Sequence, residues 1–471
     1  MHRTNSFRLV FACVGLIGAA GCDWVGSRDS GPAMPAPPRA ESKPKSSMQP
    51  PGELVHSGSW PGWRGPNRDC LSKETGLIDS FTSSGPPIKW HVDGMGGGYS
   101  SVAIDSGRIF TLGNIDGQCH VLALNFANGR RFWAVPIGGG EPNSTPTVDG
   151  NRVYALSDKG TLVCLDVADG KIIWKREMTT DFGGTRPNWG YSESVLVDGD
   201  RVVCTPGSKR AMLAALNKKT GETIWTAPMP DSLGAAPNSA GGYSSIVISN
   251  GAGVKQYVQL VGQGLVSYRA DDGKFLWNYG KIANGTANIP TPLVKDDYVF
   301  GSSGYGAGSA LLQLEKSGDG VAAKEVYFLN GGILQNHHGG MVLFGDYIYC
   351  GRGHNSGFPV CVELKTGKIK WDGGRGPGQG SAAVLEADGE LIFRYENGVV
   401  AMIEATPEKY NLKGRFSTAT HKGSGWPHPV IVDKQLFLRD GDDLIRYDIA
   451  RKDAPKQAAE PRASRHQVAE D

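Results

Sequence analysis

The chain has 471 residues, and 49 Lys and Arg against 47 Asp and Glu leave a formal net charge of +2. This balance argues against a nucleic-acid-binding protein, because such proteins usually carry a basic surface. Glycine is in excess, with 67 residues, about twice its average share, and 11 tryptophans accompany it. Long helix-forming runs are few, so the composition predicts an all-β chain of short strands and turns.

The N-terminus has the pattern of an export signal. Two arginines precede a twelve-residue apolar run, 9–20, which is too short to span a bilayer permanently. The small residues 19–21 before Cys22 resemble the lipobox of bacterial lipoproteins, although Ala19 stands where leucine is usual. The resemblance implies acylation of Cys22 and anchoring to the cell envelope, at the inner or the outer membrane. An ordinary secretory signal with a chance cysteine is the alternative.

Both ends of the chain are predicted to be linker or tail. Seven of the 21 residues 31–51 are proline, and none is Val, Ile, Leu, Phe, Tyr or Trp. Such a segment cannot bury enough apolar surface to offset its ordering entropy, and proline makes it extended. We therefore divide the chain into a signal peptide (1–22), a disordered tether (23–58), a folded domain (59–450) and a disordered tail (451–471).

A repeated motif runs through the folded domain. Each copy has a strand-like start, a polar turn, a glycine and a tryptophan four residues later, and the copies are 123–133, 164–174, 215–225, 267–277 and 361–371. Two further strands with period-two alternation precede each copy, as in TPTVDGNRVYAL (145–156). One unit is therefore four antiparallel strands.

The spacing of the units predicts the fold. Aromatic residues that end a strand recur every 41 to 52 residues: Trp90, Trp133, Trp174, Trp225, Trp277, Tyr327, Trp371 and Phe416. Four strands in about 40–50 residues are typical of a propeller blade. Residues 86–92 supply a fourth strand without three before it, and 428–450 supply three without a fourth. We expect an eight-bladed β-propeller closed by the N-terminal strand in the last blade; seven blades would require one degenerate unit to be a loop.

The strings ADGKIIW, KTGETIW and KTGKIKW resemble the tryptophan-docking repeats of the quinoprotein, or PQQ-binding-like, β-propeller superfamily, over about 60–450. This superfamily includes PQQ-dependent alcohol dehydrogenases and also lipoprotein scaffolds such as the outer-membrane protein assembly factor. The segment WPGWRGPNRD (60–69) is similar to one in bacterial members of uncharacterised role. Because the tryptophan fills the gap between blades, the motif indicates the fold and says little about chemistry.

In the dehydrogenases of this superfamily, a Ca²⁺ ligated by Glu, Asn and Asp holds the PQQ, and adjacent cysteines often form a disulfide. Here no two cysteines are adjacent, and the dehydrogenase spacing is absent although Asn188, Glu193 and Asn336 are candidate ligands. The sequence also lacks HExxH, GxSxG and P-loop motifs. We favour a non-catalytic binding protein, and the alternative is a PQQ- and calcium-dependent dehydrogenase with divergent ligands.

Six cysteines lie in the folded domain, and none has the CxxC spacing of a zinc site. Cys350 and Cys361 flank the turn 351–358 on consecutive strands. A symmetric pairing of these strands would place them opposite one another, close enough for a disulfide. Export permits oxidation, so Cys350 and Cys361 are a possible disulfide pair; free buried thiols are the alternative, and they are what we expect for the other four cysteines.

Long loops indicate the candidate site. The connections into each innermost strand and the turns 301–308 and 351–358 emerge on one face of a propeller, and two of these connections span 20 residues. Loops longer than connectivity requires are usually where recognition resides. The segments before the innermost strands should ring the channel mouth, and the candidate ligand-binding residues in them are Tyr99, Asn143, Asn188, Trp189, Tyr191, Glu193, Tyr243, Asn288, His337, His338, Gln379, Trp426 and His428.

Aromatic faces with amides and imidazoles suit a sugar, a peptide loop or a quinone. The alternative is that these residues only pack where the strands converge. We expect no metal, because His337 and His338 would point to opposite faces of an extended strand, although His428 from another blade could join one of them. We predict a monomer that binds a protein or saccharide in the cell envelope and does not bind nucleic acid.

Overall fold

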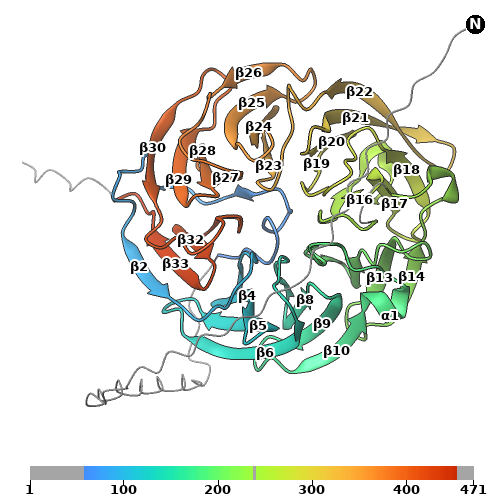
Figure 1. Cartoon of the computed structure of the whole chain (residues 1–471), viewed down its shortest axis with the longest axis horizontal. Coiled ribbons are helices and arrows are strands. Elements are labelled where there is room, and N and C mark those ends of the chain that lie inside the picture. The colour runs from blue at the N-terminus through green and yellow to red at the C-terminus, as the bar shows by residue number, and fades with distance from the viewer. Residues whose placement is uncertain (1–57, 237–239, 453–471) are drawn as a thin grey trace, which may run out of the picture. The chain divides into compact units, whose positions relative to one another are not determined.

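The computed structural model describes residues 58–236 and 240–452. The predicted signal peptide, nearly all of the predicted tether and most of the tail lie outside these residues. The described chain forms eight antiparallel blades arranged around a central channel (Figure 1). The prediction of an eight-bladed β-propeller is confirmed, and the units at Tyr327 and Phe416 are complete blades.

The first four blades follow the chain order. From the channel outward, blade one has β3 (Ala103–Asp105), β4 (Arg108–Ile115), β5 (Gln118–Asn125) and β6 (Arg131–Gly139), and blade two has β7 (Thr147–Asp149), β8 (Arg152–Leu156), β9 (Thr161–Asp166) and β10 (Ile172–Glu177). Blade three has β11 (Leu196–Asp198), β12 (Arg201–Cys204), β13 (Leu213–Asn217) and β14 (Thr223–Ala227). Blade four has β15 (Val247–Ser249), β16 (Gln256–Val261), β17 (Gly264–Arg269) and β18 (Phe275–Tyr279).

The next three blades follow the same order. Blade five has β19 (Leu293–Lys295), β20 (Tyr298–Ser303), β21 (Gly308–Ser317) and β22 (Gly320–Leu329). Blade six has β23 (Met341–Phe344), β24 (Tyr347–Arg352), β25 (Phe358–Glu363) and β26 (Ile369–Asp372). Blade seven has β27 (Ala382–Ala387), β28 (Glu390–Tyr395), β29 (Val399–Glu404) and β30 (Leu412–Ser417). A two-residue strand, β1 (Leu71–Ser72), pairs in parallel with β27 inside the channel.

The eighth blade joins the two ends of the domain. Its strands from the channel outward are β31 (Val430–Val432), β32 (Gln435–Asp440), β33 (Asp443–Asp448) and β2 (Ile88–Val92). The outermost strand β2 pairs with β33 through Trp90 opposite Arg446 and Val92 opposite Leu444. The predicted closure by the N-terminal strand is therefore confirmed, and the ring has no unpaired blade.

The repeated glycine and tryptophan join several of the blades to the next one. A Cβ on Gly221 would lie 2.8 Å from the Trp174 indole, and one on Gly273 would lie 2.7 Å from Trp225. Trp174 also donates its indole N–H to the carbonyl oxygen of Lys218 in the following blade. The tryptophan of one blade therefore covers the turn of its neighbour, where only glycine leaves room for the ring. In blade five Tyr327 takes this place and donates its hydroxyl to Leu364 O.

The possible disulfide between Cys350 and Cys361 is not formed. Cys350 lies opposite Val360 and Cys361 lies opposite Tyr349, so the two thiols point to opposite faces of the sixth blade. Both are free and buried. The loop between β24 and β25 has five residues, 353–357, and this odd number shifts the register by one residue from the predicted facing pair.

A segment before the first blade runs inside the channel, and we call residues 60–72 the channel segment. Trp60 exchanges two backbone hydrogen bonds with Ile104 of the first blade. Arg64 donates to Met341 O in the sixth blade, and Arg68 donates to Val195 O beside the third. The segment therefore contacts blades on several sides of the ring, and Figure 1 shows it at the centre.

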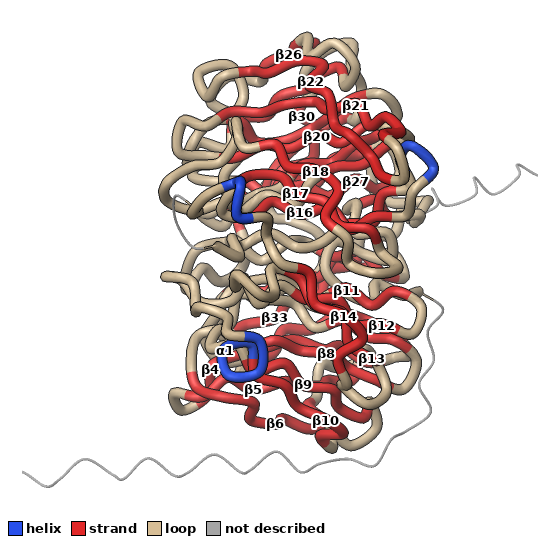
Figure 2. Tube along the Cα trace, turned by 90° about the vertical axis from the view of Figure 1, so that its right-hand side faces the viewer, coloured by secondary structure: helices blue, strands red, loops and turns tan. Residues whose placement is uncertain are grey.

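The two faces of the ring differ in their loops. We call the face with the connections into the innermost strands the upper face and the opposite one the lower face. The side view in Figure 2 shows strands as the bulk of the ring and the helix α1 (Met178–Phe182) in a connecting loop. Gly58 contacts Asp433 in a lower-face turn, and Arg451 N–H donates to Gly76 O nearby. Both ends of the described domain are therefore at the lower face.

In the part of the chain that the structure describes, no helix has the length and apolarity needed to cross a membrane.

Candidate functional site

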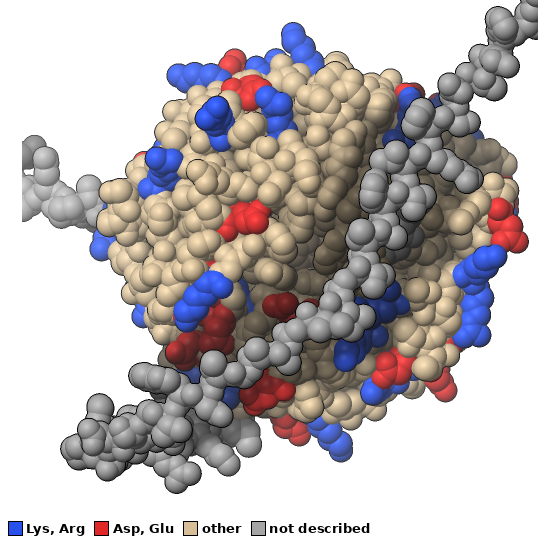
Figure 3. Space-filling model, in the orientation of Figure 1, with Lys and Arg blue, Asp and Glu red and all other residues tan. Residues whose placement is uncertain are grey.

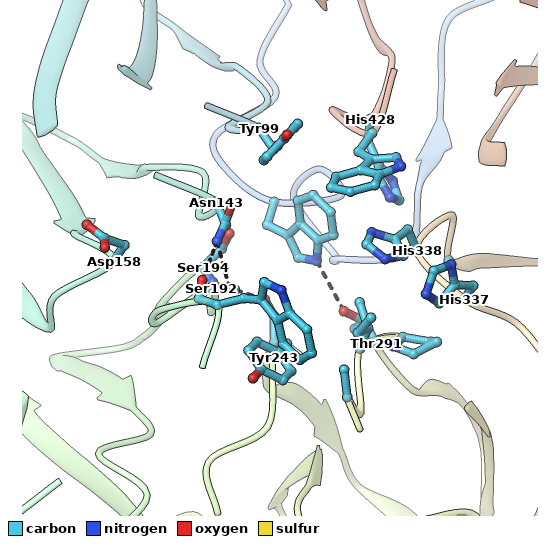
Figure 4. A pocket seen from close by; sticks show the side chains of 18 of the residues that line it. Tyr99, Asn143, Asp158, Ser192, Ser194, Tyr243, Thr291, His337, His338 and His428 are labelled. Carbon is cyan, nitrogen blue, oxygen red and sulfur yellow. Dashed lines mark hydrogen bonds between the residues drawn. The ribbon is translucent and has the colours of Figure 1, made fainter. Parts of the chain in front are cut away.

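A cavity of about 660 Å³ lies at the centre of the upper face. Loops from every blade and the channel segment contribute to its wall, and Figure 4 shows their side chains converging from around the ring. Eight of the predicted site residues line it: Tyr99, Asn143, Trp189, Tyr243, His337, His338, Trp426 and His428. Because the segments before the innermost strands meet at one mouth of the channel, residues that are far apart in sequence come together here.

One side of the cavity is a continuous run of rings. Tyr99 and Trp426 have ring centroids 4.6 Å apart, and Trp426 and His338 are 4.2 Å apart. The run continues through His337, 3.9 Å from His338, to His354 at 4.3 Å. We call these five residues the aromatic wall.

Three histidines of this region are neutral. Burial, together with neighbouring imidazoles, lowers the pKa of His337 to about 2 and that of His338 to about 4. Burial and the nearby Arg64 lower the pKa of His428 to about 3. His337 uses both ring nitrogens within the protein, one with Ser381 Oγ at 2.9 Å and one with the Tyr305 hydroxyl at 3.1 Å. These rings therefore present uncharged faces to the cavity.

The opposite side carries an exposed tryptophan. Trp189 is 54% exposed and meets Tyr243 edge to face, with ring centroids 5.7 Å apart. The Asn143 amide donates to Trp189 O at 2.8 Å and to Ser192 Oγ at 3.2 Å, which fixes the loop that carries the ring. Behind it, Tyr191 is buried and donates its hydroxyl to Pro206 O. The loop is thus held firmly while its indole faces solvent.

The channel segment supplies the floor of the cavity. The Trp63 indole N–H donates to Thr291 Oγ1 at 3.1 Å, the bond drawn as a dashed line in Figure 4. The same indole lies 4.4 Å from the His428 ring. Arg64 beside it is buried and is held by backbone carbonyls, including that of Arg68 at 3.1 Å. The channel beneath the cavity is therefore filled by protein.

Charged side chains surround the rim, and Figure 3 shows both signs around the central hollow. Asp158 accepts from Arg186 at 2.8 Å and is neutralised by it. Tyr99 lies near two carboxylates, since burial and then Glu141 and Glu396 raise the pKa of its hydroxyl. Within residues 58–236 and 240–452, neither of these glutamates forms an ion pair.

Five predicted site residues do not line the cavity. Tyr191, Glu193 and Asn288 are buried behind its wall, whereas Asn188 and Gln379 are exposed away from it. Glu193 accepts from Thr205 N–H at 2.7 Å and from its hydroxyl at 3.0 Å, and burial raises the pKa of Glu193 to about 8. Asn288 accepts from Asn284 N–H and from Ser303 Oγ, both at 3.0 Å. The bonds of Glu193 and Asn288 brace loops from within.

Sequence reasoning missed several lining residues: Trp63, Arg64, Glu141, Asp158, Lys159, Arg186, Tyr305, His354, Asn355 and Glu396. Tyr305 and His354 lie in the turns 301–308 and 351–358, which the sequence already places at this face, so the same topology could have found them. Trp63 and Arg64 precede the first repeat, and no periodic signal points to the channel.

The candidate ligands of a calcium-bound quinone do not fit such a site. Glu193 belongs to the third blade and is bonded to Thr205, whereas Asn336 precedes the sixth and donates to Gly351 O at 2.9 Å. The channel segment lies between these two sides of the ring, and Asn188 is exposed outside the cavity. Among the described residues, no three His, Cys, Asp or Glu side chains are grouped to hold a metal ion.

Comparison with known proteins gives relatives of different kinds. Over 230 residues the chain is 26% identical to tetrathionate hydrolase of Acidithiobacillus ferrooxidans. The matched region covers 45% of this chain and 43% of that protein. Over 150 residues it is 29% identical to outer membrane protein assembly factor BamB of Salmonella typhimurium, covering 32% of each. The chain thus spans less than half the length of either curated relative.

Two solved structures share the fold. The BamB crystal structure from Moraxella catarrhalis matches with a TM-score of 0.56 and 14% identity, over 77% of this chain and 99% of that one. Quinohemoprotein alcohol dehydrogenase from Comamonas testosteroni matches with a TM-score of 0.56 and 12% identity, over 85% and 82%. Residues 117–373, more than half of the chain, match the family model described as outer membrane protein assembly factor BamB. Together with the eight blades and their repeated tryptophans, this match shows that the chain belongs to the BamB family of PQQ-repeat β-propellers.

Proposed function

We propose that this protein is a non-catalytic β-propeller of the cell envelope that binds a segment of polypeptide in its upper-face cavity. The cavity itself carries the proposal. Its opposite sides present the aromatic wall and the Trp189–Tyr243 pair, and its floor is closed by Trp63. Ring faces separated by amides and hydroxyls suit apolar side chains joined by a polar backbone.

A polypeptide is favoured over a saccharide by two observations. The rim carries charges of both signs, with Glu141 and Glu396 near Tyr99 and with Lys159 and Arg186 among the other lining residues. Charged side chains of a peptide can form ion pairs with both signs, whereas an uncharged sugar can offer these groups hydrogen bonds but no opposite charge. The family is named for the assembly of outer membrane proteins, which supports a protein ligand.

The anchor is part of the proposal. Cys22 lies outside the described residues, and its acylation would attach the chain to a membrane through the segment that leads to Gly58. Gly58, where the described domain begins, is at the lower face, opposite the cavity. If Cys22→Ala left the exported protein in the membrane fraction as before, lipid attachment at this residue would be wrong.

The binding test uses the full chain and immobilised arrays of random-sequence peptides and of oligosaccharides. We expect selective peptide binding, weakened several-fold by Trp189→Ala, because stacking on an aromatic ring contributes about 0.5–1.5 kcal/mol beyond area burial. Ile224→Ala is the matched control, since Ile224 is similarly exposed, at 46%, on an outer strand away from the cavity. Binding of saccharides alone, weakened by the same Trp189 change, would contradict the proposal.

A further inference from the structure

We infer that the cavity recognises a basic side chain, whose guanidinium or ammonium group lies against Tyr99 and Trp426 between the carboxylates of Glu141 and Glu396. This inference rests on the proposed function and adds the chemistry by which the polypeptide is chosen. Three features of the site support it: unpaired carboxylates, neutral ring faces and a fixed position for one of the acids.

The carboxylates differ from the other acid of the cavity. Asp158 is neutralised by Arg186 at 2.8 Å, whereas in the described part of the chain Glu141 and Glu396 have no basic partner. Both line the same cavity as Tyr99, and after burial their charges are the further causes that raise the pKa of the Tyr99 hydroxyl. Two negative charges beside one aromatic ring therefore lack a cation, and a ligand can supply it.

The rings that line the cavity with these acids suit a cation. Tyr99, Trp426 and His338 are joined at centroid distances of 4.6 and 4.2 Å. A guanidinium or ammonium group is attracted to the face of such rings, and most strongly to tryptophan. His338 does not oppose it, because burial lowers the pKa of this imidazole to about 4 and keeps it uncharged near neutral pH.

Glu396 is held in place before any ligand arrives. Its carboxylate oxygens accept from Ser424 Oγ and from Ser381 N–H, both at 3.3 Å. A Cβ on Gly380 would lie 2.5 Å from the Glu396 Cβ, so the loop passes directly against this side chain. An acid fixed in this way loses little conformational entropy on binding, and this favours a pre-formed site.

Cations elsewhere in the cavity give the ligand a direction. Arg64 lies at the floor, where it donates to Met341 O, and Lys159 comes from a loop of the second blade. These two groups repel a basic side chain from the floor and from the second-blade side, whereas the charge of Arg186 is already paired with that of Asp158. The cation is therefore confined to the side formed by blades seven, eight and one.

The test compares two peptides that differ only in charge. One contains a single arginine flanked by apolar residues, and the other has citrulline, its neutral analogue, at the same place. Fluorescence anisotropy with the full chain should give at least tenfold tighter binding of the arginine peptide. Glu396→Gln and Glu141→Gln should each reduce this preference at least threefold, whereas Glu222→Gln, an exposed glutamate on an outer turn, should leave it unchanged.

The outcomes separate the two proposals. Equal affinity for both peptides would overturn the inference and leave peptide binding intact, as would an arginine preference unchanged by either glutamine variant. Failure of both peptides, and of peptides with Lys, Glu or Asp in the same place, would overturn the proposed function itself. If Glu396→Gln does not fold, Glu141→Gln still decides, because Glu141 is exposed at the rim.

Discussion

The indole of Trp133, on the outer strand of the first blade, lies against Gly170 in a turn of the second: a Cβ on Gly170 would come within 2.8 Å of the ring. The same indole donates its N–H to Val167 O at 3.2 Å. The same two contacts join Trp174 to the third blade, whereas Trp225 keeps the ring contact with Gly273 but its indole N–H has no hydrogen-bond partner among the described residues.

Gly170→Ala should therefore destabilise the protein more than an ordinary turn substitution. Gly150→Ala is the control, because both glycines have positive φ, 75° and 56°, but a Cβ on Gly150 would have nothing within 4 Å. The left-handed backbone costs each alanine about 1–2 kcal/mol, and overpacking adds about 1–3 kcal/mol at Gly170 alone. Urea unfolding measures the difference, and equal losses would contradict the packing role.

Deleting residues 76–94 should lower the melting temperature and expose the edge of the last blade. The deletion removes β2 and also Phe81, which packs on Phe416 with ring centroids 5.0 Å apart. Loss of these contacts leaves β33 unpaired, and an unpaired edge promotes association. Calorimetry and light scattering measure the two effects; unchanged melting would mean that closure adds no stability.

The six described cysteines should react with alkylating reagents only after unfolding. All are buried, and burial raises the pKa of both Cys350 and Cys361 to about 12, so the thiolate is scarce at neutral pH. Reducing agent should leave the melting temperature unchanged. Mass spectrometry of the digested protein checks for a bridge. A linked pair of peptides that contains Cys350 and Cys361 and has a mass lower by two hydrogens would show a disulfide and contradict this prediction.

Stability should fall as the pH drops below about 6.5. Folding lowers the pKa of His337, His338 and His428 to about 2, 4 and 3, so the unfolded chain binds protons that the folded chain does not. The stability that the folded chain gains from keeping these three imidazoles neutral is fully present above about pH 6.5, the unfolded pKa of histidine. It is lost progressively as the pH falls towards 4. Buried carboxyls with raised pKa, such as Glu193, act in the opposite direction as the pH rises.

A variant isolates the histidine effect. His338→Gln should reduce the pH slope of the unfolding free energy between pH 4.5 and 6.5, by up to about 1.4 kcal/mol per pH unit. Urea unfolding at several pH values measures it. An unchanged slope would mean that His338 titrates alike in the folded and unfolded chain.

Added PQQ and Ca²⁺ should not bind at one equivalent or support dye-linked alcohol oxidation. The reason is geometric: Glu193 is bonded to Thr205, and Asn336 lies across the channel segment from it. Equilibrium dialysis and a dye assay test this. One bound quinone with alcohol oxidation would favour the dehydrogenase alternative.

The fold could be predicted because its repeats depend on local sequence. Trp133 and the other strand-ending aromatics recur in a turn motif that is readable without tertiary information, and the incomplete first and last units indicate closure. The register around residues 353–357 could not be predicted, because the pairing depends on whether the loop has an odd or an even number of residues. This one-residue difference separates the thiols of Cys350 and Cys361.

The candidate site was predicted in part for a similar reason. Topology places residues such as Trp189 and His338 at one mouth, and they line the cavity. Topology does not tell which way a side chain points, so Tyr191 and Glu193, two and four residues after Trp189, are buried instead. The floor was missed, because Trp63 and Arg64 reach the channel only through long-range contacts with Thr291 and Met341.

Closure of the last blade has a consequence for biosynthesis. Trp90 pairs with Arg446, which is made 356 residues later, so β2 leaves the ribosome long before its partner strand exists. N-terminal parts generally fold first during synthesis, but this strand must wait with an open edge. A nascent chain that stalls before β33 (Asp443–Asp448) therefore cannot complete the ring, and loss of these few late residues should affect solubility as severely as removal of a whole blade.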